Sequence, residues 1–327
     1  KLRMKVPVGV EEFAERARQW VLRPQRSPLV EAWQNKRVPK LGIFSDIPRH
    51  KFREDEAQAW ARAGFEVVLC DGEHSLSDGF YGREQYECML RLGLTPIQRL
   101  PRDAASQFGD AFALGARGVM RPYGTTQQDL DDFLEYCQYP DGGDNKPSAL
   151  RRGAFPLRRG DGTFVGGNDV LRDAQRHQIV SLQFESTEYV LDTSLRRDLL
   201  RKLNDYSSSD RISAIAFLGA IDLAMRATAD ELPRLDQGIT DFLNDCRDSF
   251  PNCAAGGIFG DKMDPTVNST VNPNHRKSVE AIKNAIQQGA LLVVCPYLAS
   301  ELPFVGAHAA ALDFHTALAE LGLSSED

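Results

Sequence analysis

The sequence of 327 residues has only six cysteines, and no two of them form a Cys-x-x-Cys pair. This scarcity argues against a disulfide framework or a cysteine-based zinc site, so we expect buried or surface thiols. No stretch reaches the ~18 consecutive apolar residues that a membrane span needs. Residues 1–20 also lack the apolar core of a secretory signal. We therefore expect a cytoplasmic protein with no membrane partner.

Positive charge is also in short supply. The chain carries 39 Lys and Arg residues against 46 Asp and Glu residues, which gives a formal net charge of −7. Because nucleic-acid affinity depends on neutralising phosphates, we expect no nucleic-acid partner. Hydrophobic residues make up 42% of the chain and charged residues 26%. This composition excludes disordered, collagen-like and coiled-coil classes and suits a soluble enzyme or small-molecule binder.

The sequence does contain a series of short, continuously apolar runs. Continuous runs, as opposed to alternating ones, are typical of strands that are covered on both faces, as in parallel sheets. We expect strands at residues 41–46, 65–71, 95–100, 118–124, 179–185, 213–219, 254–261 and 289–296.

Helical patterns fill the intervals between these runs. They lie at residues 55–63, 82–91, 104–114, 127–139, 187–204, 230–249, 278–288 and 303–321, with a further helix at 10–21. Eight strand–helix units in series predict an α/β fold, a (β/α)8 TIM barrel, with an open doubly wound sheet as the alternative. We expect one barrel domain over residues 1–327, in which 1–40 form an N-terminal extension.

Two further segments stand out. Residues 140–168 have no periodicity and are rich in Gly, Pro and Arg. Loops longer than ~15 residues are usually functional lids or disordered linkers, and this one could cover either mouth of the barrel. The helix expected at 303–321 has an apolar set too wide for one barrel-facing stripe, so we expect residues 300–327 to serve oligomerisation.

Polar residues gather where the expected strands end, which is where chemistry takes place in such barrels. Carboxylates in a half-buried mouth need a cation or an arginine as partner. Glu185 and Asp222, on adjacent strands, suit a hard divalent ion such as Mg²⁺ or Mn²⁺. The alternative is that each carboxylate accepts backbone N–H groups at a helix start. The complete set of strand ends is Asp71-Gly72-Glu73-His74, Gln98-Arg99, Arg121 with Tyr123, Gln183 with Glu185, and Gly219 to Asp222.

Five motifs carry a resemblance to a known family. They are LCDGEHS (69–75), QRLP (98–101), ALGARGVMRPY (113–123), LQFES (182–186) and FLGAIDLA (217–224). Between residues 41 and 261 the sequence resembles the HpcH/HpaI aldolase/citrate lyase family, whose members are class II, pyruvate-dependent aldolases on a (β/α)8 barrel. The fungal macrophomate synthase belongs to the same family.

The resemblance implies roles for individual residues. Glu185 and Asp222 would hold Mg²⁺ or Mn²⁺, and Arg99 would stabilise the enolate oxygen of the substrate. His74 would act through a water as acid and base, which suits a group with a pKa near neutrality. A metal and a guanidinium at the keto oxygen stabilise an enolate where its charge forms.

Four further residues are expected to bind the substrate. Gly219 and Ala220 would offer backbone N–H groups to the substrate carboxylate, and Gln183 belongs to the same motif as Glu185. Arg121 stands where these aldolases generally carry an aliphatic residue. We expect it at the mouth beside Arg99, where it either binds a second carboxylate of the substrate or pairs with Asp71.

The sequence also departs from the family pattern. Ala113 stands where family aldolases usually carry an Asp that partners the base histidine; Asp110, one helical turn earlier, is a candidate replacement. Extra residues centred on 195–209 separate the two metal ligands, and the segment 294–300 (VCPYLAS) replaces a usual Gly-Ser-Asp ending.

The expected function is therefore a metal-dependent carbon–carbon lyase or aldolase that forms a pyruvate-type enolate from a 2-oxo acid. One alternative decarboxylates oxaloacetate and uses the enolate in biosynthetic C–C bond formation, as in macrophomate synthase. Another is a barrel that only binds. The resemblance further implies a homo-oligomer, a trimer or hexamer, whose last helix is exchanged between subunits.

Overall fold

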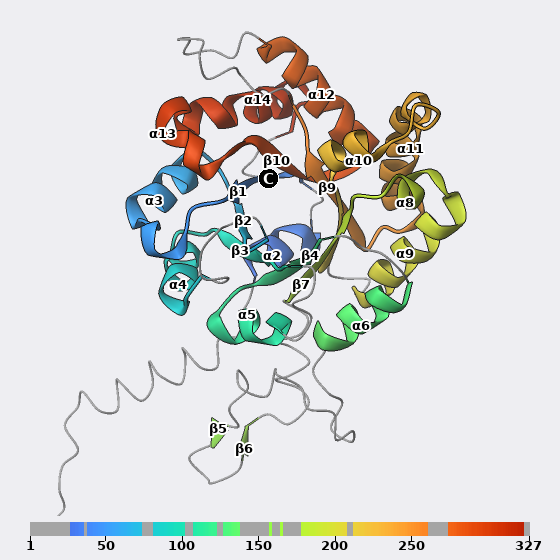
Figure 1. Ribbon diagram of the computed structural model, residues 1–327. Helices are drawn as coiled ribbons and strands as arrows, with labels where there is room; N and C mark the ends of the chain where they lie inside the picture. The colour runs from blue at the N-terminus through green and yellow to red at the C-terminus, as the bar shows by residue number, and fades with distance from the viewer. Residues whose placement is uncertain are drawn as a thin grey trace, which may run out of the picture.

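The computed structural model describes residues 27–35, 38–73, 81–101, 107–122, 127–137, 157–158, 164–165, 178–207, 212–260 and 274–323. Within these residues, eight parallel strands close into a barrel in the order β1-β10-β9-β8-β7-β4-β3-β2. The helices surround the barrel, and Figure 1 looks along its axis. The predicted (β/α)8 barrel is confirmed, and the open sheet is excluded.

All eight barrel strands coincide with the apolar runs of the sequence. They are β1 (Lys40–Ser45), β2 (Val67–Asp71), β3 (Thr95–Arg99), β4 (Gly118–Arg121), β7 (Ile179–Phe184), β8 (Ala214–Leu218), β9 (Cys253–Ile258) and β10 (Ala290–Leu298). Nearly every residue in them is buried, because lumen side chains cover one face and helices the other. Of the segment 140–168 the structure describes only β5 (Leu157–Arg158) and β6 (Phe164–Val165), which pair antiparallel.

The helices follow the expected order. They are α2 (Pro28–Asn35), α3 (Glu54–Arg62), α4 (Arg83–Arg91), α5 (Phe108–Leu114), α6 (Gln127–Cys137), α8 (Thr187–Leu191), α9 (Thr193–Tyr206), α10 (Ala220–Arg226), α11 (Leu232–Asn244), α12 (His275–Gln288), α13 (Leu302–Val305) and α14 (Ala307–Glu320). The expected helix 187–204 divides at Asp192, whose carboxylate accepts the Leu195 N–H at 3.0 Å and so begins α9. The expected helix 303–321 divides at Gly306, where φ is +79°.

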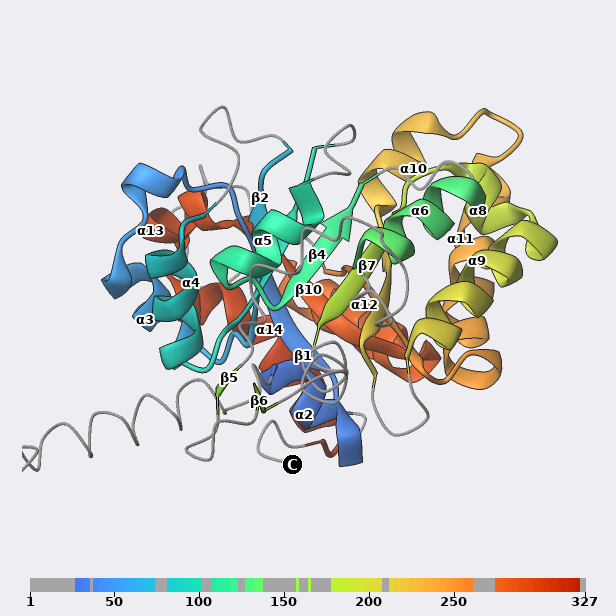
Figure 2. The ribbon, with the colours of Figure 1, turned by 90° about the horizontal axis from the view of Figure 1, so that it is seen from below.

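A short helix, α2, closes the amino-terminal end of the barrel. Leu29, Val30 and Trp33 are buried and pack with the apolar side chains of the lumen. The Leu29 N–H also donates to Thr95 Oγ1 at 3.3 Å, at the start of β3. Figure 2 shows α2 at one end of the barrel and α10 at the other. The expected helix at 10–21 lies outside the described residues.

Alternation along the strands decides which side chains enter the lumen. Phe44, Leu69, Ile97, Met120 and Phe217 belong to the lumen cluster, whereas the side chains between them belong to the cluster beneath the helices. Successive strand residues point to opposite faces. Counting from this set, the pattern places Asp71, Arg99, Gln183 and Glu185 on the lumen side and Gln98 and Arg121 on the helix side.

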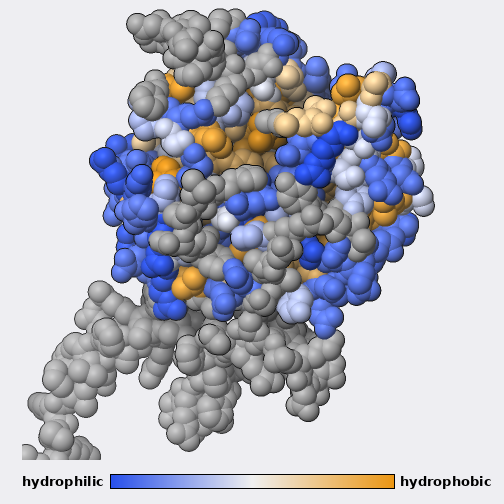
Figure 3. Space-filling view, viewed as in Figure 1, coloured by the Kyte–Doolittle hydropathy of each residue, from blue (hydrophilic) through white to orange (hydrophobic). Residues whose placement is uncertain are grey.

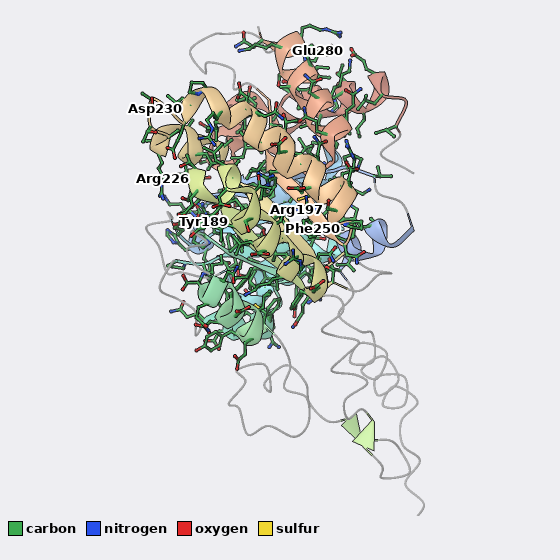
Figure 4. All side chains as sticks on the ribbon, turned by 90° about the vertical axis from the view of Figure 1, so that its right-hand side faces the viewer. Tyr189, Arg197, Arg226, Asp230, Phe250 and Glu280 are labelled. Carbon is green, nitrogen blue, oxygen red and sulfur yellow. The ribbon has the colours of Figure 1, made fainter. Side chains whose placement is uncertain are left out.

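The outer layer is held by ion pairs as well as by apolar contacts. Arg196 of α9 is 3% exposed, and its Nε donates to Asp245 Oδ2 at 2.9 Å. Next to it, the Arg197 guanidinium lies 5.7 Å from the centroid of the Phe250 ring, and both residues are labelled in Figure 4. All six cysteines are buried, free thiols.

The C-terminal helix packs on its own barrel. Phe314 and Leu318 of α14 are 2% exposed, and the helix lies against α12, α3 and β10. Exchange of this helix between subunits and assembly into a trimer or hexamer remain predictions. Among the described residues, none of the helices combines the length and the apolarity that crossing a membrane requires.

Candidate active site

A buried arginine, Arg99, lies at the carboxyl-terminal mouth of the barrel. Arg99, the last residue of β3, is 6% exposed. Its Nε donates to Asp71 Oδ1 at 3.0 Å and its Nη2 to Asp71 Oδ2 at 2.7 Å, so that β2 and β3 are joined by a two-donor ion pair. Glu73 Oε2 lies 3.1 Å from Nη1. Two carboxylates therefore hold one guanidinium in a fixed orientation.

An aromatic floor lies under this guanidinium. The Arg99 Cζ lies 5.0 Å from the centroid of the Phe44 ring, a distance at which cation–π attraction operates. Phe44 in turn meets Phe217 edge to face, with the ring centroids 5.9 Å apart. The Arg99 guanidinium thus packs against the apolar side chains that fill the lumen.

Two strands further round the barrel from β3, the mouth carries another buried carboxylate. Glu185 follows β7 and is 2% exposed. It packs against Gly219, which follows β8, because a Cβ built on Gly219 would stand 2.6 Å from Glu185 Cγ and 3.3 Å from Oε1. Asp222 lies in the first turn of α10, which begins directly after Gly219, and is half-buried. The two predicted metal ligands therefore follow neighbouring strands at one mouth.

One predicted role of Gly219 is wrong. Its N–H donates to the Phe184 carbonyl at 3.0 Å and continues the pairing of β7 with β8, so this group is already used inside the protein. What Gly219 contributes to the site is the absence of a side chain, which leaves room for Glu185. The role of Ala220, the first residue of α10, stays a prediction.

The predicted position of Arg121 is also wrong. Its guanidinium lies on the helix side of β4, where Nη1 donates to the Asp129 carbonyl at 3.0 Å and Nη2 to Asp129 Oδ1 at 3.1 Å. Asp129 belongs to the first turn of α6. Met120, the neighbour of Arg121 in the chain, is the residue that enters the lumen and pairs in register with Arg99. The structure thus pairs Arg121 with Asp129 and not with Asp71, and a contact of Arg121 with substrate stays a prediction.

The lumen face of β7 carries a row of polar groups. Ser181, Gln183 and Glu185 alternate with apolar residues that face the helices. Ser181 Oγ and Gln183 Oε1 are buried and have no hydrogen-bond partner among the described residues. Buried polar atoms of this kind are generally satisfied by water or by a ligand. The predicted contact of Gln183 with substrate stays a prediction.

Some of the predicted site residues lie outside the described part of the chain. His74 and Tyr123 lie outside the described residues, as do most of residues 140–168. Asp110 lies in the first turn of α5 and is half-buried, in the same helix as Ala113. The replacement of the missing His74 partner by Asp110 therefore stays a prediction.

Three residues of the site have roles that the sequence did not indicate. Glu73 was visible in the DGEH motif but had no assigned role, and it pairs with Arg99. Phe44 was hidden in an apolar run, and only its place at the end of β1 puts it under Arg99. Asp71 was considered as a partner of Arg121 and is instead the partner of Arg99.

Known proteins resemble this chain in sequence and in fold. No protein-family model matches the chain. The hydroxypyruvate/pyruvate aldolase of Roseobacter denitrificans is 28% identical over 143 residues, which are 43% of this chain and 54% of that protein. The chain thus matches about half the length of this curated relative.

Solved structures share the fold over nearly the whole chain. An HpcH/HpaI aldolase from Desulfitobacterium hafniense has a TM-score of 0.57 at 14% identity, covering 88% of this chain and 93% of that one. An HpcH/HpaI aldolase/citrate lyase family protein from Burkholderia cenocepacia has a TM-score of 0.56 at 18% identity, covering 90% and 99%. At these identities the structures show a common barrel fold. The match to the aldolase confirms the resemblance that the sequence carries.

Proposed function

We propose that this protein is a carbon–carbon lyase of the class II aldolase type, which forms a pyruvate-type enolate from a 2-oxo acid with the help of a divalent metal ion. The observation that carries the proposal is the fixed guanidinium of Arg99 at the same mouth as the buried carboxylate of Glu185. The similarity to a hydroxypyruvate/pyruvate aldolase supports pyruvate and hydroxypyruvate as donor substrates.

The carboxylates at the mouth fit a hard divalent cation. Asp71 and Glu73 contact the guanidinium of Arg99, while Glu185 and Asp222 follow β7 and β8 at the same mouth. Carboxylates in such a half-buried position are stabilised when a cation binds between them. Glu185 and Asp222 would hold the ion, and both offer oxygen donors, which Mg²⁺ and Mn²⁺ prefer.

The number of protein ligands also fits. No group of three or more His, Cys, Asp or Glu side chains in the described part of the chain is arranged to hold a metal. Mg²⁺ typically takes one or two carboxylates and fills its remaining positions with water and substrate oxygens. A bound divalent ion would supply Lewis-acid stabilisation of the charge that develops on the keto oxygen.

The protein groups supply orientation and a second positive charge. Asp71 occupies one edge of the Arg99 guanidinium, and the remaining N–H groups of Nη1 and Nη2 are those that would donate to the enolate oxygen. Because the two carboxylates and Phe44 hold the guanidinium in place, little reorganisation is needed when the enolate forms. His74 would exchange the proton of the second carbonyl or hydroxyl group.

A decarboxylating, C–C bond-forming enzyme remains the second candidate. It drew support from the missing partner Asp at Ala113 and from Arg121 as a site for a second carboxylate. The pairing of Arg121 with Asp129 on the helix side weakens the second of these supports. Simple enolate formation from a monoacid therefore accounts better for the described side chains.

Deuterium exchange of the pyruvate methyl group tests the proposal directly. In D₂O with Mg²⁺ or Mn²⁺, the enzyme should replace the methyl protons, which NMR follows, and EDTA should stop the exchange until metal is added back. Release of CO₂ from oxaloacetate without methyl exchange of pyruvate would favour the second candidate. No turnover of pyruvate, hydroxypyruvate or oxaloacetate with either metal would leave a barrel that only binds.

A further inference from the structure

Two fully buried residues beside the site have no part in the proposed chemistry. The Tyr86 hydroxyl of α4 donates to Gln98 Oε1 at 2.6 Å, and both residues are 0% exposed. Burial raises the pKa of the Tyr86 phenol well above its ordinary value. The hydroxyl therefore keeps its proton and is a permanent donor to the amide oxygen.

The other end of the Gln98 amide joins two strands. Its Nε2 donates to the Cys70 carbonyl of β2 at 3.0 Å and to the Arg99 carbonyl of β3 at 2.9 Å. The Cys70 carbonyl comes directly before Asp71 in the chain, and the Arg99 carbonyl belongs to Arg99 itself. Gln98 therefore bonds to the main chain next to both members of the Asp71–Arg99 ion pair. The Gly72 N–H reaches the same Arg99 carbonyl at 2.9 Å.

We propose that Tyr86 and Gln98 form a positioning clamp that fixes the Arg99 guanidinium from outside the barrel. The proposal rests on the function proposed above, in which Arg99 faces the enolate. Gln98 acts through the main chain of β2 and β3, while Arg99 and Asp71 meet on the opposite, lumen face of the same strands. Neither clamp residue touches the substrate.

Tyr86 is needed because the Gln98 amide has an acceptor atom, Oε1, as well as the donor Nε2 that bonds to the two carbonyls. Only the orientation with Nε2 toward the two carbonyls is favourable; the reversed amide would place Oε1 against two other oxygens. In this orientation the Tyr86 hydroxyl donates to Oε1 and satisfies the buried acceptor. Without this hydroxyl, Oε1 is buried and unpaired, and a buried unpaired acceptor costs about 1–3 kcal/mol. The Gln98 side chain then shifts to relieve this loss, and its bonds to the two carbonyls weaken.

The test compares two buried tyrosines whose hydroxyls bond to different groups. In Tyr86→Phe, we expect kcat for pyruvate methyl exchange to fall about 10-fold while KM changes less than about twofold, because a misplaced donor weakens the transition state more than substrate binding. Tyr81→Phe is the matched control. Tyr81 is 4% exposed and its hydroxyl bonds to Ser45 Oγ at 2.8 Å and the Ile47 carbonyl at 2.7 Å, away from Arg99.

The control separates positioning from simple stability. Both variants lose one buried hydroxyl, so both should lower the temperature of unfolding, but only Tyr86→Phe should lower kcat. Gln98→Glu should lower kcat as well, because its carboxyl group accepts from Tyr86 but offers no N–H to the two carbonyls. Equal kcat in Tyr86→Phe and Tyr81→Phe would overturn the proposal.

A double-variant cycle tests whether the clamp acts through Arg99. In an Arg99→Lys background, Tyr86→Phe should cause no further loss of kcat, since the group that the clamp positions is gone. Losses that multiply would show independent action and overturn the proposal. If the wild-type enzyme exchanges no methyl protons, the proposed function fails, and a crystal structure of Tyr86→Phe decides about the clamp. A displaced Gln98 amide and a lengthened Arg99–Asp71 contact would support it, and an unchanged ion pair would overturn it.

Discussion

The side chain of Glu185 lies so close to Gly219 that any residue larger than glycine would collide with it. A Cβ on Gly219 would stand 2.6 Å from Glu185 Cγ. The φ angle of Gly219 is −87°, which any L-residue adopts. Glycine is required here for space and not for backbone conformation. The requirement links the ends of β7 and β8, where we place the metal ion.

This contact predicts the effect of Gly219→Ala. The added methyl group should push the Glu185 carboxylate from its position and lower the affinity for Mn²⁺ at least about 10-fold, which titration calorimetry measures. Gly118→Ala is the matched control, since its Cβ would stand 2.9 Å from both Ile179 Cβ and Ile97 Cγ1, away from the mouth. The control should lose stability but keep its Mn²⁺ affinity. Equal Mn²⁺ affinities in the two variants would contradict the placement of the metal.

Neutral replacements of the two carboxylates test the metal site itself. Glu185→Gln and Asp222→Asn keep the size of the side chains but remove the negative charge that a divalent ion needs, so metal-dependent methyl exchange should be lost in both. Mn²⁺ binding followed by electron paramagnetic resonance gives a readout that does not depend on turnover. Full activity of either variant after EDTA treatment and Mg²⁺ add-back would show that its carboxylate is not a ligand.

The fold could be predicted from the sequence because strands buried on both faces need continuous apolar runs. The runs that end near Asp71, Arg99 and Glu185 each became a barrel strand in the expected order. Because both faces of each strand are apolar, the sequence does not show which of its residues point into the lumen and which point toward the helices. Gln98 and Arg121 were therefore placed at the mouth, although each is one residue out of phase with the lumen set.

Contacts between segments that are distant in the sequence could not be predicted either. The bond from Tyr86 to Gln98 joins a helix to a strand, and nothing in either local pattern indicates it. Helix α2 has only 8 residues, and it is stabilised by the barrel end that it closes. The motifs identified Glu185 and Asp222 as candidates, whereas the space that Gly219 leaves for Glu185 depends on strand pairing.

Arg99→Lys should reduce methyl exchange at least about 100-fold, because lysine cannot present two parallel donors in one plane. The bond from Nε and Nη2 to Asp71 requires this planar arrangement. A lysine would keep the positive charge, so binding of Mn²⁺ should change little. Near-normal exchange by this variant would remove Arg99 from the enolate site.

His74→Ala should impair aldol cleavage more than the decarboxylation of oxaloacetate. Decarboxylation needs an electron sink at the keto oxygen, which Arg99 and the metal ion would supply, whereas aldol cleavage also needs a base for the hydroxyl proton. Parallel assays of the two reactions, at the same enzyme and Mg²⁺ concentrations, measure the difference. Equal losses in both reactions would contradict a role as acid and base.

Arg121→Leu should lower stability without changing substrate specificity. Arg121 is 8% exposed, and its guanidinium joins the end of β4 to the first turn of α6 through both the carbonyl and the carboxylate of Asp129. A hydrogen bond to a charged group contributes about 1.5–3 kcal/mol to stability, so thermal unfolding should begin several degrees lower. Because the guanidinium lies on the helix side of β4, the KM values for pyruvate exchange and for oxaloacetate decarboxylation should both stay unchanged. Asp129→Asn is the matched control, since it removes the charge of the partner but keeps its carbonyl, and it should reproduce part of the loss in stability. A KM that rises for oxaloacetate alone would return Arg121 to the substrate site and restore a diacid as the natural substrate.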